Sequence, residues 1–254
     1  MRRLNAFGPK PGYVPTIACI NAATVGLGVD FDRLVSALQK YVDKYLAPVW
    51  GTPAKLVKAT KPRHNAWTMI FIDTAHDIRN LRAELKKTFG KNIVDQIVAT
   101  HLFKSRPVAF VFAQNVLADD DPPLRDGDKI SMAASHELAE MLVDPGNNLW
   151  CEDGNGSLYA YEVCDVVEAK SFRVNGLAMS NFVYPAFFEG FHKRNSVQFD
   201  HMKKVKRPFE ILKDGYAPAR KAGKRHLLTL LSTPKKRRKL RNENRDLHRS
   251  EFRR

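Results

Sequence analysis

The fold is decided by residues 129–145, KISMAASHELAEMLVDP, in which His136, Glu137 and Glu140 stand among mainly apolar neighbours. The apolar pattern predicts a mostly buried helix over about 129–143, ended by the Asp-Pro-Gly run that follows. Residues four positions apart share one face of a helix, so His136 and Glu140 can both reach a single metal ion. Glu137 is rotated from His136 by about 100° and would stand beside that ion, where a general base is needed.

Two ligands do not make a metal centre, because catalytic zinc usually takes three from the protein and leaves one position for water. The segment YEVCDVVE, residues 161–168, follows the helix and offers Glu162 and Asp165. Either carboxylate can complete the set, and we rank Glu162 first. Cys164 is a weaker alternative, because in a strand its side chain would point away from the face that carries Asp165.

The motif formed by residues 136–140, His-Glu-x-x-Glu, also fits a surface histidine followed by solvated carboxylates. The flanking residues are apolar, however, and charged groups are rarely buried unless they are paired or bind a metal. The second carboxylate cluster also favours a metal site. Zinc (Zn2+) is the first metal to consider, and the carboxylate-rich ligand set makes manganese (Mn2+), or another ion that prefers oxygen, a second.

Three motifs in this region also match a known group of proteins. They are Ser-His-Glu-x-x-Glu-x-x-x-Asp-Pro from Ser135, Trp-x-x-Asp-Gly from Trp150 and Glu-Val-x-Asp from Glu162. Together they resemble zincin-like metallopeptidases of the His-Glu-x-x-Glu type, found among uncharacterised bacterial and phage proteins. A related pattern occurs in exordium-like plant proteins. The resemblance covers residues 17–188.

The resemblance implies a zincin-type fold with His136 and Glu140 as metal ligands and Glu137 as the base. Glu162 or Asp165 would be the third ligand. In such a hydrolase the metal polarises a scissile carbonyl and lowers the pKa of bound water towards about 7. Glu137 would take the proton of that water and pass it to the leaving amine of a peptide or protein substrate.

Two further parts of a peptidase site can be proposed from the sequence. The apolar segment 107–112, PVAFVF, predicts a buried strand along which an extended peptide could bind by β-addition. An oxyanion donor is also needed, and three side chains are candidates: Tyr161, Tyr184 and His192. The remaining histidines, including His101, show no ligand spacing with one another and are interpreted as surface or hydrogen-bonded residues.

The rest of the first 200 residues predicts an α+β fold, with a mixed sheet packed on the active-site helix and antiparallel hairpins after it. Besides 107–112, strands are expected at 16–20, 54–57 and 67–72. One helix starts after the N-cap Asp30 and ends at Pro48. Further elements are a helix at 77–89 and a hairpin at 171–183 that turns at Asn-Gly.

The formal net charge of +15 is concentrated towards the C-terminus. Residues 201–254 contain 19 basic and 5 acidic side chains, whereas residues 1–200 have a net charge of only +1. We therefore predict a metal-binding domain at 1–200 and a basic arm at 201–254. Residues 201–216 can still dock on the domain, and the arm is expected to be largely extended or disordered beyond them.

The densest basic cluster of the arm is expected to bind nucleic acid or another polyanion through phosphates, independently of base sequence. A solvated tail is the alternative, and an anionic membrane is less favoured because no amphipathic helix is evident. The cluster consists of Lys235, Lys236, Arg237, Arg238, Lys239 and Arg241.

Location and activity are further expectations. No apolar run approaches the roughly 20 residues that span a bilayer, and prolines interrupt the stretch after the basic start, so no signal peptide is expected. The 3 cysteines suit a reducing compartment. We therefore expect a cytoplasmic protein. Association with nucleic acid or a virion, or a nuclear location in a eukaryotic host, is compatible with this expectation. The alternative to a hydrolase is a non-catalytic nucleic-acid-associated or virion protein on the same scaffold.

Overall fold

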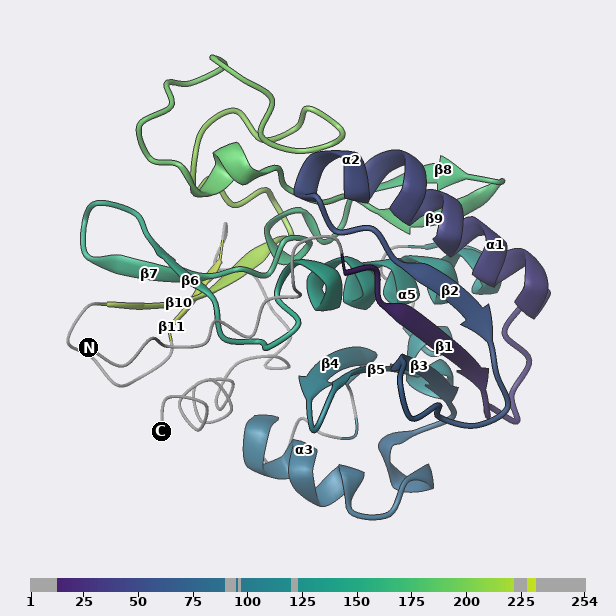
Figure 1. Cartoon of the computed structure of the whole chain (residues 1–254). Helices are drawn as coiled ribbons and strands as arrows, with labels where there is room; N and C mark the ends of the chain where they lie inside the picture. The colour runs from purple at the N-terminus through teal and green to yellow at the C-terminus, as the bar shows by residue number, and fades with distance from the viewer. Residues whose placement is uncertain (1–12, 90–94, 96, 120–122, 222–227, 232–254) are drawn as a thin grey trace.

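The structure is a computed structural model that describes residues 13–89, 95, 97–119, 123–221 and 228–231 (Figure 1). Its main sheet has 5 strands in the order β2-β1-β3-β5-β4. All neighbouring strands are parallel except β4, which is antiparallel to β5. The strands are β1 (Thr16–Asn21), β2 (Lys55–Lys58), β3 (Trp67–Ile72), β4 (Ala99–Phe103) and β5 (Pro107–Phe112).

Side chains of the central strands alternate between two hydrophobic cores, as the two-residue period of a strand requires. On β3, Met69 and Phe71 face the larger core, whereas Ile70 and Ile72 face the smaller one. The larger core contains the buried faces of α1 (Phe31–Tyr41) and α5 (Asp126–Val143). The smaller core lies on the other face of the sheet and includes Leu81 of α3 (Leu81–Phe89).

The first helix confirms its expected start but not its expected end. The Asp30 carboxylate accepts a hydrogen bond from the Arg33 amide, as an N-cap does. The prediction that Pro48 ends the helix is wrong. The chain continues through a π-helical segment (Val42–Leu46) into α2 (Ala47–Trp50), whose first turn accommodates the proline. Gly51, with a left-handed φ of 68°, ends it.

The central helix α5 is buried along most of its length and packs against β4 and β5 of the main sheet. It is preceded by the short helix α4 (Ala113–Leu117) and begins three residues before the predicted start. On its other side it contacts β9 (Leu177–Ser180). With β8 (Ser171–Val174), β9 forms the predicted Asn-Gly hairpin, whose turn residues both have positive φ.

A second sheet, at the left of Figure 1, has the strand order β11-β10-β7-β6. All neighbouring strands in it are antiparallel. The mixed sheet and the antiparallel hairpins confirm an α+β fold. The strands are β6 (Trp150–Glu152), β7 (Ser157–Ala160), β10 (Tyr216–Lys221) and β11 (Leu228–Leu231).

Residues after Asp200 pack on the residues before it. Asp200 is fully buried and accepts hydrogen bonds from the Val205 amide and the Asn181 side chain. Strand β10, which we had assigned to the basic arm, pairs with β7, and Tyr216 is buried. Packing therefore does not change at the predicted domain boundary, and well-packed chain extends at least to the end of β10.

Candidate metal centre

Helix α5 brings its three motif residues together in the interior. His136, Glu137 and Glu140 have exposed fractions of 6%, 1% and 0%. One helical turn separates His136 from Glu140, and His136 Nε2 lies 3.1 Å from Glu140 Oε1. Two ligands that are each about 2.1 Å from one ion lie roughly 3.0–3.5 Å apart, so this separation fits a shared metal. The alternative of a solvated surface motif is wrong.

Asp165 approaches the same histidine from outside the helix. It begins a short 3-10 turn (Asp165–Val167), and its Oδ1 lies 3.1 Å from His136 Nε2. The hydroxyl of Tyr216, from β10, donates a hydrogen bond to that same Oδ1. The second sheet therefore fixes the orientation of a carboxylate that faces the motif, as outer partners of metal ligands commonly do.

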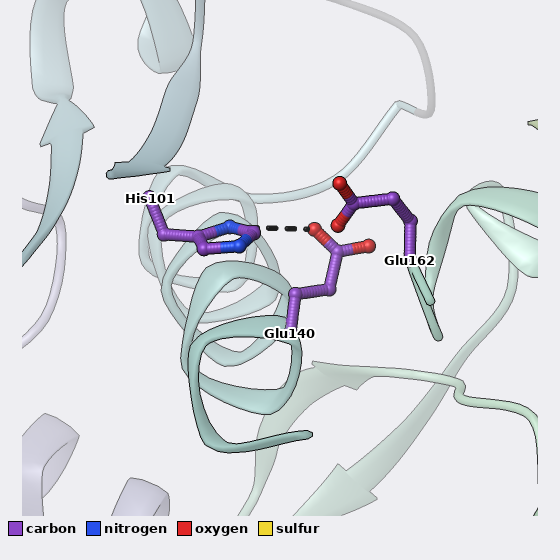
Figure 2. A group of neighbouring side chains, drawn as sticks. All are labelled: His101, Glu140 and Glu162. Atoms are coloured by element: carbon purple, nitrogen blue, oxygen red, sulfur yellow. Dashed lines mark ion pairs between the residues drawn. The ribbon is translucent and has the colours of Figure 1, made fainter. Parts of the chain in front are cut away.

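Glu162 lies in a different part of the cluster. His101, Glu140 and Glu162 each offer a potential ligand atom, and the three atoms lie within 4.8 Å of one another (Figure 2). A second such group consists of His136, Glu137 and Glu140. The two candidates for the third ligand are thus separated: Asp165 is hydrogen-bonded to His136, and Glu162 is grouped with His101. Neither group includes Cys164, whose backbone amide donates to Glu140 Oε1.

His101 is the site residue that sequence reasoning missed. It is 1% exposed, and its Nδ1 lies 3.0 Å from Glu137 Oε2 and 3.8 Å from Glu140 Oε2. Its position follows from β4, in which it pairs with Ala109 of β5, a residue of the core that contains α5. The signal available in the sequence was a lone histidine inside the apolar run IVATHLF, which carried no ligand spacing.

Burial and mutual repulsion shift the pKa values of these groups. Burial raises the pKa of Glu140 from 4.5 to about 8, and the negative charge of Asp165 adds to the shift. Burial alone would lower the pKa of His136, but the Glu140 charge and the hydrogen bond to Asp165 raise it well above 6.5. Burial acts likewise on His101, whose pKa is nevertheless raised by its bond to Glu137.

The donor set fits a divalent cation. Four carboxylates and two imidazoles, all of them buried, meet in one region, and burying so much negative charge is costly without a cation. Two buried atoms of this cluster have no hydrogen-bond partner among the residues that the structure describes: Nε2 of His101 and Oε2 of Glu140. Buried polar atoms normally have a partner, so these two are free to bind an ion.

The other predicted site residues contact different groups. Tyr161 stacks on Phe188, with 4.2 Å between ring centroids, and His192 lies 2.7 Å from Glu189. Tyr184 contacts the imidazole of His201. Their role as oxyanion donors stays a prediction. The basic cluster at 235–241 lies outside the described residues.

Comparisons with family models, with curated proteins and with solved structures give no match for this chain. In the parts of the chain that the structure covers, no helix is long and apolar enough to cross a membrane.

Proposed function

We propose that the protein is a metal-dependent hydrolase of the zincin-like type that acts on peptides or proteins. One observation carries the proposal: His136 Nε2 lies 3.1 Å from oxygens of both Glu140 and Asp165, inside the protein and beside Glu137. An imidazole with a carboxylate oxygen of each of two acidic residues beside it offers a three-ligand set for zinc or manganese. Asp165 is the third ligand in this proposal, in place of Glu162.

A metal bound there would polarise the substrate carbonyl and acidify a bound water. Glu137 follows His136 directly and would accept a proton at its carboxylate. His101 Nδ1 pairs with Glu137 Oε2 and holds that carboxylate in place. Tyr216 holds Asp165 in the same way. The base and the third ligand would therefore each be oriented by a residue of a different sheet, His101 from the main sheet and Tyr216 from the second.

Neither β5 nor β4 presents an exposed edge to which a peptide could be added. We had expected residues 107–112 to form the accessible edge, which is wrong because β5 lies between β3 and β4. Strand β4 ends the sheet order and carries His101, but Ala99, Thr100, His101 and Leu102 are at most 5% exposed, and the Asn147 side chain donates a hydrogen bond to the His101 carbonyl oxygen.

Replacing the base tests the activity. We expect Glu137→Gln to keep the bound metal but to lower peptide cleavage by about 10²–10⁴-fold, because the amide cannot accept the proton. The matched control is Glu152→Gln, at an exposed position of β6. Metal content by mass spectrometry and cleavage of a mixed peptide library are the measurements. Purified protein without a transition metal, or equal cleavage by both variants, would contradict the proposal.

A second proposed function is binding of nucleic acid through the basic arm. Residues 232–254 contain 10 basic and 3 acidic side chains. We expect deletion of 232–254 to abolish retention on DNA or heparin at low salt, and the affinity of the full chain to fall steeply as salt rises. Retention unchanged by the deletion would exclude this function. If the full chain is retained on DNA or heparin but binds no metal and cleaves no peptide, the non-catalytic nucleic-acid-associated or virion protein is favoured instead.

A further inference from the structure

Glu140 faces two imidazoles with its two carboxylate oxygens. Its Oε1 lies 3.1 Å from His136 Nε2, whereas its Oε2 lies 3.8 Å from His101 Nδ1. The proposed function uses only the first of these contacts. We propose that His101, Glu140 and Glu162 make another cation position, with Nε2 of His101 as its nitrogen ligand, so that the centre binds two divalent ions with Glu140 as the bridging ligand.

The hydrogen bonding of His101 is that of a metal ligand. Its Nδ1 pairs with Glu137, so in the neutral ring with Nδ1 protonated the lone pair is on Nε2. Nε2 is buried and has no hydrogen bond in the described part of the chain. A histidine that binds a metal through one nitrogen normally donates the other N–H to a carboxylate or carbonyl. Glu137 provides that carboxylate here.

The geometry suits an ion between the three side chains. His101 comes from the edge strand β4, Glu140 from α5 and Glu162 from the segment after β7, and all three point towards one another (Figure 2). Two ligands that are each about 2.1 Å from one ion can lie up to about 4.2 Å apart. His101, Glu140 and Glu162 each offer one ligand atom, and these atoms lie within 4.8 Å of one another, so small movements of the flexible glutamate side chains bring them within that limit.

The charge of the whole cluster also favours two ions. Glu137, Glu140, Glu162 and Asp165 are each at most 2% exposed. Two divalent cations balance four ionised carboxylates next to two neutral imidazoles, whereas one cation leaves an excess of buried negative charge. A carboxylate that bridges two ions holds them about 3.5–4 Å apart, the spacing at which paired metals act together on a substrate in hydrolases. A carboxylate-rich set of this kind favours manganese or zinc.

The inference shares Glu140 with the proposed function but is tested separately from it. Metal-free protein is titrated with Mn2+, and bound metal is measured by mass spectrometry and by electron paramagnetic resonance. We expect two equivalents of Mn2+ and a spin-coupled spectrum from the unmodified protein. His101→Gln should bind one equivalent and give the six-line spectrum of an isolated ion, because only the position at His136 remains.

The possible outcomes distinguish the two proposals. A single uncoupled ion that is kept by His101→Gln and lost by His136→Gln would overturn the second position and leave the first intact. A single ion with the opposite dependence would overturn the first position. No bound ion would overturn both. The control is His76→Gln, an exposed histidine whose side chain is 57% accessible. The spectrum of the unmodified protein decides the question even if His101→Gln fails to fold.

Discussion

At the scale of single residues, the structure adds a second histidine, His101, to the candidate ligands that include His136. The spacing of His136 and Glu140 on one helix face made their convergence predictable, because helix geometry fixes it. The contribution of His101 was not predictable in this way. It depends on the pairing of β4 with β5, which brings a residue 36 positions away in sequence to Glu137. Which of the two carboxylates, Glu162 or Asp165, lies beside His136 likewise depends on how the chain turns after β7.

The shifted pKa values predict how the metal-free protein responds to pH. Because the pKa of Glu140 is raised from 4.5 to about 8, its protonation contributes stability that is fully present below about pH 4.5. That contribution is lost as the pH rises through about 8. His136, with a pKa well above 6.5, has the same sign. The chelated protein should therefore melt at a lower temperature near pH 8 than near pH 5.

Thermal melts in a chelator across that pH range check this expectation, with Glu140→Gln as the comparison because its amide does not titrate. Added Mn2+ or Zn2+ should raise the melting temperature more near pH 8 than near pH 5, since metal ligands must be deprotonated. A melting temperature that depends on pH equally in Glu140→Gln and in the unmodified chain would contradict the assigned role of Glu140.

At the scale of elements, local signals were reliable where the element forms from its own sequence. The strands β3 and β5 match their predicted bounds, and the Asn-Gly hairpin turns where expected. Strand β4 was not predicted, because Thr100 and His101 interrupt the apolar residues of the segment 97–103. Pro48 misled us because a proline in the first turn of a helix costs little, and the helix restarts there. Edge and interior positions in the sheet are set by tertiary pairing and could not be predicted.

At the scale of the whole molecule, the candidate metal centre is built from three separate parts of the chain. The main sheet supplies His101, α5 supplies the motif, and the strand β10 supplies Tyr216. The charge pattern had assigned β10 to a basic arm, and composition cannot distinguish a solvated segment from a strand that pairs with β7. The described chain before residue 222 therefore acts as one packed unit around the site.

This arrangement predicts that two truncations of the C-terminus differ in their effects. Deleting 232–254 should leave metal affinity and the melting temperature unchanged, because β10 and its pairing with β7 remain. Deleting 216–254 should lower both, since it removes the Tyr216 hydroxyl that donates to Asp165 and exposes the buried face of β7.

Tyr216→Phe isolates the hydroxyl and should weaken metal binding by about 10–100-fold while the fold persists. Calorimetric titration with Mn2+ measures the affinities. Equal affinity in Tyr216→Phe and the unmodified chain would show that Asp165 needs no support from β10, and would remove the link between the C-terminal strand and the metal centre.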